Sequence, residues 1–153
     1  MPRNLKYLVP LLAALGALLV PLGASARLAA CESPSCLWAS FEPSMGVVQP
    51  GSIVKFTYIA LPTNVANLTA TAMLPPELQV LQKGSSPFHL VDGRPTWDRK
   101  NLNTTSVIHF NTMVKKTARR GKRVAVTLHV IAQTGDWQQV DNMFLPMHIA
   151  KHK

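Results

Sequence analysis

The residues in this sequence with the clearest chemical potential are six cations between Lys115 and Arg123. Cations this close together reinforce one another's field and favour an acidic glycan, an anionic membrane surface or a nucleic-acid backbone. No aromatic side chain interrupts the run, so stacking on single-stranded nucleic acid has no support. A solvated loop, or a dibasic cleavage site, would have the same composition. The candidate polyanion-binding residues are Lys115, Lys116, Arg119, Arg120, Lys122 and Arg123.

Histidines offer a second possibility, which is metal binding. Two strands expected to pair antiparallel, with Val114 opposite Val124, would place His109 opposite His129. Facing residues on neighbouring strands have Cβ atoms about 5 Å apart, close enough to share one ion. Two ligands do not make a closed site, and an ordinary exposed pair is the simpler interpretation. A looser group that could suit copper comprises His148, His152, Met143 and Met147.

Two cysteines, Cys31 and Cys36, are separated by four residues. In an oxidising compartment, a local disulfide between them is the plainest interpretation. The preceding Leu28-Ala29-Ala30 also resembles a bacterial lipoprotein box, in which a lipid on Cys31 would anchor the chain to a membrane. The pair is a poor zinc site and lacks the two-residue spacing of redox motifs.

No pattern in the sequence supports catalysis. No serine lies in a G-x-S-x-G context and no glycine-rich loop cradles phosphate. The seven carboxylates are scattered, without a pair for acid–base work. The sequence therefore predicts a protein that is not an enzyme and that needs no cofactor.

The N-terminal segment predicts export. Arg3 and Lys6 precede an apolar run from Leu8 to Leu22, and Ala24-Ser25-Ala26 supplies small residues at a cleavage spacing. The run is shorter than the roughly 20 residues that a membrane-spanning helix needs. We expect a signal peptide at 1–26, with an uncleaved anchor as the alternative. The protein would then be secreted or at the cell surface, and periplasmic or lipid-anchored if bacterial, which argues against a nucleic-acid partner.

Two N-glycosylation sequons begin at Asn67 and Asn103. The first opens an expected strand and the second lies in an expected turn. Asn103 is therefore the better acceptor, and both matter only in a eukaryote.

The elements that must position these residues are short β-strands. In Ser52–Leu61 the apolar side chains alternate, which is the period of a half-buried strand. After a polar corner, Asn67–Met73 forms a threonine-rich strand that ends at Pro75-Pro76, because proline cannot donate to a sheet ladder. Leu37–Pro50 predicts one or two edge strands broken at Pro43.

Further strands follow toward the C-terminus. A short strand is expected near Leu78–Leu81, and Asp92-Gly93 predicts a hairpin turn. Ser106–Val114 and Val124–Ala132 are expected to pair, with Phe110 against Leu128, which would place the basic loop at one end. Met143–Ile149 adds a final short strand, interrupted at Pro146. Seven or eight strands of this kind predict an antiparallel sandwich.

The order of these features resembles a known family. Pro50-Gly51, an alternating strand, a corner at Asn64, Leu74-Pro75 and then Asp92-Gly93 are similar to the conserved-repeat domains of unknown function in bacterial and archaeal surface proteins. The resemblance covers Val47 to about Ala132, in a single copy, and Ala72 stands where the family usually carries an aspartate. It implies an immunoglobulin-like sandwich that serves as a stalk, a spacer or an adhesive unit.

The expected organisation is a signal peptide (1–26), a segment with the cysteine pair (27–46), the sandwich (47–132) and a C-terminal strand or tail (133–153). The chain has 153 residues and a formal charge of +9, which suits one domain. The leading hypothesis is a structural or adhesive surface module that binds a protein or an acidic polysaccharide. The alternatives are a polyanion-binding module acting through residues 115–123 and an extracellular metal carrier using histidine and methionine.

Overall fold

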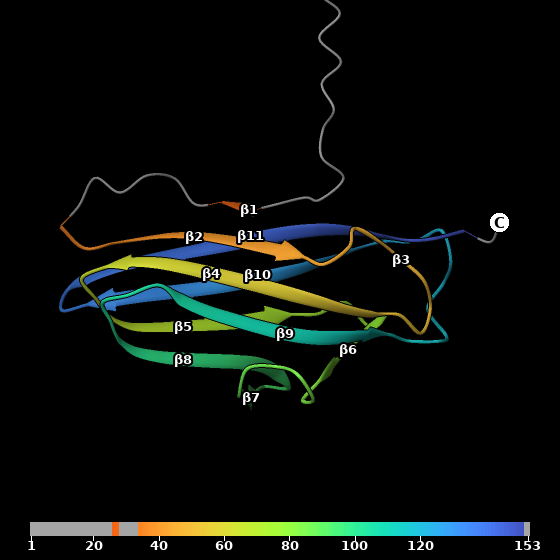
Figure 1. The fold of residues 1–153 in the computed structure, drawn as a ribbon, viewed down its shortest axis with the longest axis horizontal. Helices are drawn as coiled ribbons and strands as arrows, with labels where there is room; N and C mark the ends of the chain where they lie inside the picture. Colours follow the sequence, from red (N-terminus) through yellow and green to blue (C-terminus); the bar gives the residue numbers. More distant parts are fainter. Residues whose placement is uncertain (1–25, 28–33, 152–153) are drawn as a thin grey trace, which may run out of the picture.

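The computed structural model describes residues 26–27 and 34–151, and every helix or strand in them is a β-strand (Figure 1). The predicted all-β sandwich is confirmed, with eleven strands in these residues rather than seven or eight. The first sheet contains, in spatial order, β1 (Ala26–Arg27), β2 (Cys36–Pro43), β4 (Ile53–Thr63), β9 (Ser106–Val114) and β6 (Leu78–Leu81). The second contains β3 (Val47–Val48), β11 (Trp137–Ile149), β10 (Arg123–Thr134), β5 (Val65–Met73), β8 (Arg94–Leu102) and β7 (His89–Val91).

The strand order is that of an immunoglobulin-like fold. Four strands, β2-β4-β9-β6, face three, β5-β10-β11, as in the constant-type domain. Strands β8 and β7 extend the second sheet beyond β5, in the place where variable-type domains add strands. Here β6 precedes both of them in the chain, so the connections differ although the spatial arrangement is alike.

The core lies between the sheets and follows the predicted alternation. In β4, Val54, Phe56, Tyr58 and Ala60 are fully buried while Lys55 is exposed. Five aromatic side chains form a continuous row through the interior, with neighbouring ring centroids 4.9–6.1 Å apart. This row joins the two sheets from one side of the sandwich to the other. Its members are Phe41, Phe56, Phe110, Trp97 and Phe88.

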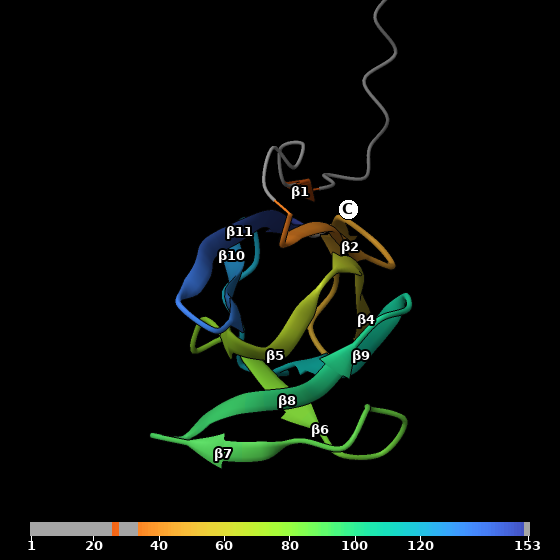
Figure 2. The same ribbon diagram turned by 90° about the vertical axis from the view of Figure 1, so that its left-hand side faces the viewer.

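One side of the sandwich is closed by a side chain that substitutes for a strand partner. Gln139 of β11 accepts a hydrogen bond from the Leu37 N–H at 3.2 Å and donates one to the Leu37 carbonyl at 3.1 Å. These two bonds tie β11 of the second sheet to β2 of the first, and the end-on view shows the two strands side by side (Figure 2). The same Gln139 amide also donates to Asp141 at 2.9 Å.

The predicted pairing of Ser106–Val114 with Val124–Ala132 is wrong. Strand β9 lies between β4 and β6, and β10 lies between β5 and β11, so the two strands belong to different sheets. Phe110 is opposite Phe56, and Leu128 is opposite Ala72 and Met143. The predicted buried faces are correct. Alternation identifies the face that a strand buries, but two such faces can meet across a core as well as within one sheet.

Most of the shorter predicted elements are confirmed. Strand β6 forms at Leu78–Leu81, and β7 and β8 form a hairpin whose turn residues Asp92 and Gly93 have φ angles of 50° and 74°. Both values are those a two-residue hairpin turn of this type requires. The final strand, β11, is longer than predicted and runs through Pro146. It is bordered by β3 only at His148 and Ile149, so Pro146 lies on an unpaired edge, where proline is tolerated.

The sandwich extends beyond residues 47–132, because β2 precedes that range and β11 follows it. The signal-peptide prediction falls on residues 1–26, of which all but Ala26 lie outside the described residues, and it stays a prediction. Ala26 and Arg27 pair with Phe41 and Ser40 of β2.

Candidate functional site

The six predicted cations all lie at one end of the sandwich. Residues 115–122 connect β9 to β10 and so cross from one sheet to the other. Ala118 is buried, and its N–H donates to the Lys115 carbonyl at 2.9 Å, which holds the loop against the core. The cationic side chains on both sides of Ala118 are exposed.

A seventh cation, Lys151, joins this end and was not found from the sequence. Gly121 donates its N–H to the Ile149 carbonyl at 2.7 Å, so the loop runs beside the end of β11. A hollow of about 390 Å³ is lined by residues of the loop and by Lys151. The cationic C-terminal residues were the only sequence signal for it. We call this region the basic end; it comprises Lys115, Lys116, Arg119, Arg120, Lys122, Arg123 and Lys151.

One carboxylate compensates part of the basic end. Lys122 forms an ion pair with Glu77, the residue before β6. The hydrogen bond from Lys122, together with the charges of Lys122 and Lys115, lowers the pKa of the Glu77 carboxyl. No ion pair with an acidic side chain of the described residues involves Arg119, Arg120 or Lys151. The field at the hollow therefore stays positive.

The predicted histidine pair does not exist. His109 is opposite Thr57 in the first sheet, and His129 is opposite Asn142 and Thr71 in the second. Because the two strands lie in different sheets, the two imidazoles lie on opposite outer faces of the sandwich. The error follows directly from the wrong pairing of β9 with β10.

The second predicted metal group is also divided. Met143 and Met147 are buried in the core, whereas His148 alternates to the outer face of β11. His152 lies outside the described residues. Within residues 26–27 and 34–151, no group of three or more histidine, cysteine, aspartate or glutamate side chains could hold a metal ion.

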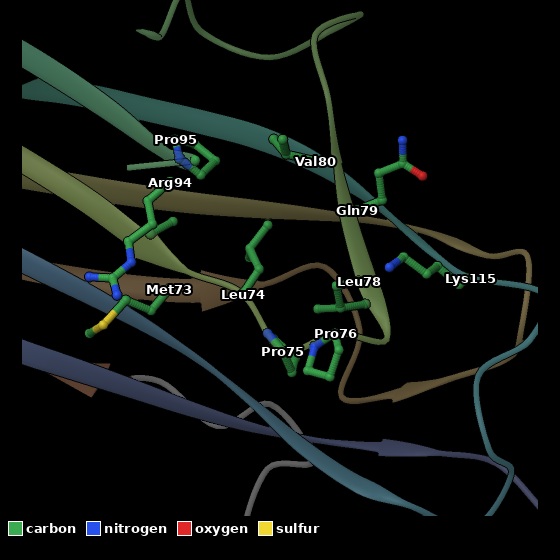
Figure 3. A pocket seen from close by; sticks show the side chains of 12 residues that line it. Met73, Leu74, Pro75, Pro76, Leu78, Gln79, Val80, Arg94, Pro95 and Lys115 are labelled. Carbon is green, nitrogen blue, oxygen red and sulfur yellow. The ribbon is translucent and has the colours of Figure 1, made fainter. Parts of the chain in front are cut away.

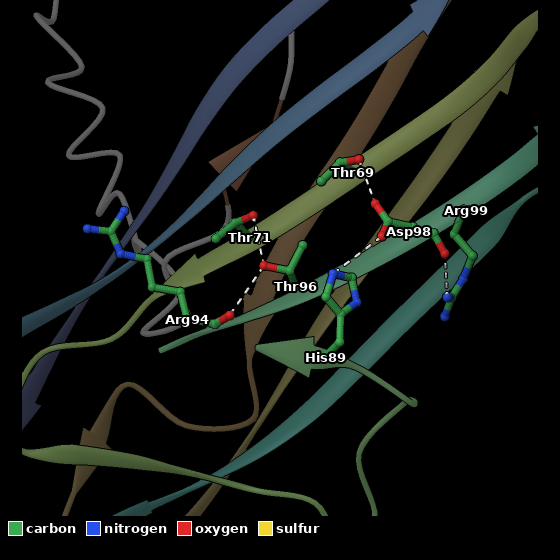
Figure 4. A network of polar contacts seen from close by, with 7 residues as sticks. All are labelled: Thr69, Thr71, His89, Arg94, Thr96, Asp98 and Arg99. Carbon is green, nitrogen blue, oxygen red and sulfur yellow. Dashed lines mark hydrogen bonds and ion pairs between the residues drawn. The ribbon is translucent and has the colours of Figure 1, made fainter. Parts of the chain in front are cut away.

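A polar network that the sequence did not predict crosses the outer face of the second sheet (Figure 4). Asp98 accepts a hydrogen bond from the Thr69 hydroxyl at 2.7 Å and lies 3.6 Å from Nε2 of His89. Beside it, the hydroxyls of Thr71 and Thr96 are 3.2 Å apart. In a catalytic triad the imidazole stands between the hydroxyl and the carboxylate; here the carboxylate is in the middle. These three side chains therefore do not have the order of a catalytic triad.

A hollow lies between residues of the two sheets, beside β6 (Figure 3). It measures about 640 Å³, which is within the range of ligand-binding cavities. Most of the residues that line it are apolar, but polar groups contribute about as much of its surface. Two cations, Arg94 and Lys115, lie on opposite sides of it. We call it the β6 groove.

The remaining predicted sites have the following positions. Cys36 is buried at the start of β2, but Cys31 lies outside the described residues, so the disulfide and the lipid anchor stay predictions. Asn67 is exposed on β5, and Asn103 is exposed in the turn between β8 and β9. Both sequons are sterically open, and their glycosylation also stays a prediction.

The hydroxyl of Tyr58 lies in the core. The Tyr58 side chain is fully buried, and its hydroxyl has no hydrogen-bond partner among the described residues. Burial raises the pKa of this hydroxyl above its usual range, and the nearby Asp141 carboxylate raises it further. The side chain therefore stays neutral in the folded protein.

The strand order and the buried core define the class of protein as an immunoglobulin-like sandwich, and comparison with known proteins agrees. No protein-family model matches the chain, and no curated protein matches its sequence. Among solved structures, it is similar to BcpA, the major pilin subunit of Bacillus cereus, with a TM-score of 0.59 and 9% identity over 83% of this chain and 40% of BcpA. A point variant of BcpA gives a TM-score of 0.57 and 12% identity over the same shares.

The chain thus spans about 40% of the length of the pilin subunit that it resembles. The GAE domain of GGA2p from Saccharomyces cerevisiae matches with a TM-score of 0.44 and 11% identity, over 80% of this chain and 97% of that domain, which is too low to carry an argument. At such identities the likeness to BcpA shows the fold alone. No helix able to span a membrane occurs in the described residues.

Proposed function

We propose that this protein is a non-catalytic immunoglobulin-like module of the cell surface with a structural or adhesive role. The observation that carries the proposal is the likeness of nearly the whole sandwich to a domain-sized part of a pilin subunit. The expected leader and the resemblance to conserved-repeat surface modules support the same setting. The order of the Thr69–Asp98–His89 network supports a structural rather than a catalytic use of the outer sheet face.

The location can be tested on intact cells. A C-terminally tagged full chain should be digested by protease added outside the cells, because we expect it to be exported. The matched control lacks residues 1–26 and should stay protected inside. Equal protection of both forms would contradict the surface role.

A second candidate function is the binding of an acidic polymer at the basic end. It is favoured by a specific observation, the convergence of Lys151 with the loop around one hollow. Four or more cations within one end produce a field that attracts polyanions and that salt screens over about 10 Å at 0.1 M ionic strength. Sulfated or carboxylated polysaccharides have the required charge and occur outside cells.

This candidate is tested by retention on immobilised heparin across a salt gradient. One variant carries glutamine at Arg119, Arg120, Arg123 and Lys151, which leaves the Lys122–Glu77 ion pair intact. The matched variant loses the same charge elsewhere, at Lys55, Lys83, Arg99 and Lys100. We expect the first variant to elute at much lower salt than the second. If both variants lost the same amount of retention, binding would depend on the total charge of the protein and not on the basic end.

A further inference from the structure

We propose that the β6 groove receives an extended peptide segment, which adds a strand to the free edge of β6 and places a carboxylate against Arg94. This inference does not depend on the proposed surface role, because it rests on the groove alone.

The free edge of β6 offers backbone groups to a partner. β6 is the last strand of its sheet and pairs only with β9. Val114 directs its N–H to Ser52 and receives a bond from Gly51, so its peptide groups face β4 and not β6. In an antiparallel ladder, the N–H and C=O groups of two directly opposite residues either both point toward the partner strand or both point away from it. Leu78, opposite Val114, therefore points its groups away from β9, and so does Val80 two residues on.

The groove follows this edge. It is lined by Leu78, Gln79 and Val80, which are consecutive. Side chains of consecutive strand residues alternate between faces, so a hollow that touches all three runs along the strand edge. The Leu78 N–H is already bonded to the Pro75 carbonyl at 3.0 Å, which leaves the Leu78 carbonyl and both backbone groups of Val80 for an incoming strand.

Several residues that line the groove are apolar, and many of them have no backbone N–H that could donate to a ligand. Leu74 packs against the core at the base of the groove, and Pro75, Pro76 and Pro95 form much of its lining. Proline has no backbone N–H, so these walls cannot donate to a ligand. The hydrogen bonds of a bound segment would therefore go to β6, while its apolar side chains fill the hollow.

The two cations beside the groove differ in their surroundings. Lys115 lies near Glu77, whose pKa it helps to lower, so part of its charge is compensated. Arg94 takes part in neither of the ion pairs found among the described residues. In Figure 3 its guanidinium extends beside Met73 on the side of the groove away from Lys115. A carboxylate of the ligand is therefore best matched at Arg94, which can bind it bidentately.

These features favour a peptide over an acyl chain. A fatty carboxylate could contact the apolar side chains of the groove and reach Arg94, but it would form no hydrogen bonds with the exposed backbone groups of Val80. A peptide satisfies all three features, which is the logic of strand addition at a sheet edge. At about 3.3 Å per residue, the four residues of β6 extend about 13 Å, so a hexapeptide is long enough.

The probe is a set of four acetylated hexapeptides in which threonine alternates with valine, leucine, isoleucine or phenylalanine. Each is prepared with a free C-terminal carboxylate and as the carboxamide, and octanoate is the acyl comparison. Binding to the ¹⁵N-labelled chain is followed by amide chemical shifts. We expect the free-acid peptides to shift the Val80 amide, and the carboxamides to bind more weakly.

Two variants make the test specific. Val80→Pro removes an N–H that points to the free edge, where proline is compatible with a strand, and replaces one apolar side chain of the groove with another. It should abolish peptide binding. Arg94→Gln should weaken the free-acid peptides by about tenfold and bring them level with the carboxamides. Lys100→Gln, an exposed change on the same strand as Arg94, is the control and should leave binding unchanged.

Three results would overturn the proposal. One is the absence of any Val80 shift with all four peptides at millimolar concentration. Another is peptide binding that survives Val80→Pro in a protein with otherwise unchanged amide shifts. The third is octanoate binding as tight as that of the peptides, which would make the groove an acyl site.

Discussion

The two sides of the sandwich, where the edges of the sheets approach each other, are completed in different ways. On one side, Gln139 of β11 bonds to both backbone groups of Leu37 and joins the sheets. On the other side β6 ends its sheet without a partner, and the hollow of about 640 Å³ lies next to it. On the first side β1 and β3 also border short parts of β2 and β11, and Gln139 covers the β2 backbone at Leu37, which β1 does not reach. The edge of β6 has no such neighbour and stays open.

This difference matters because unpaired strand edges are the surfaces on which further strands add. The Gln139 amide provides one donor and one acceptor at the spacing of a peptide group, so it occupies the β2 backbone at Leu37 as a neighbouring strand would. Val80 of β6, by contrast, lies in a strand that pairs only with β9 and ends its sheet. The comparison can be tested from both sides of the sandwich.

The largest effect is expected at Trp97, which fills the core on the side of the sandwich where β6 has a free edge. Its ring packs between Phe88 and Phe110, and its indole N–H donates to the Ser86 carbonyl at 3.1 Å. Trp97→Ala should lower the free energy of unfolding by about 3–5 kcal/mol, measured by urea denaturation. Phe144→Ala, at a position 60% exposed, is the control and should change it by less than about 0.5 kcal/mol. A loss at Trp97 as small as the one expected at Phe144 would show that Trp97 is not part of a packed interior.

A smaller loss is expected on the closed side. Gln139→Leu keeps the apolar stem but leaves both backbone groups of Leu37 without their partner. We expect a loss of about 1–3 kcal/mol in the free energy of unfolding and faster hydrogen exchange of the Leu37 amide. The neighbouring Gln138→Leu, on the exposed face, should have neither effect. If exchange at Leu37 is unchanged, the amide does not replace a strand.

The smallest effect has the opposite sign and lies at Tyr58, near Asp141 behind the closed side. Tyr58→Phe removes a buried hydroxyl that has no partner, so the free energy of unfolding should rise by up to about 1 kcal/mol. The raised pKa also predicts a pH dependence. The unfolded chain loses this proton near pH 10 and the folded protein retains it, so the tyrosine form loses stability as the pH rises above about 10.

The measurement for Tyr58 is the difference in stability between the two forms from pH 8 to pH 11. It should grow in favour of phenylalanine above pH 10 and be constant below it. A constant difference across the whole range would indicate that the hydroxyl titrates normally in the folded state.

Local features were predictable from the sequence, and long-range partners were not. The alternation in β4 identified the buried faces of Phe56 and Tyr58, and Asp92-Gly93 identified a hairpin, because both signals lie within a few residues. The same period of two could not distinguish a neighbour in the sheet from a partner across the core. β9 was therefore assigned to the wrong neighbour, β10, and His109 was wrongly expected to face His129. Gln139 and Leu37 are 102 residues apart, and nothing in either residue type predicts that the two are in contact.

The basic end shows the same division. Its loop was visible as a run of charge, but Lys151 joins it only because β11 ends beside Gly121. The β6 groove gave no signal at all, since it forms between residues of the two sheets.

The crossing of the chain from sheet to sheet also has a consequence for the order of folding. Only two pairs of strands, β7–β8 and β10–β11, are hairpins joined by a tight turn in the described residues. The other neighbours in the sheets must be brought together from distant parts of the chain, which slows folding in proportion to the loops that have to close. We expect the β10–β11 hairpin, with its twelve paired positions, to form early. The strands of the first sheet would then assemble late, and β4 and β9 would stay exposed to other chains for longest.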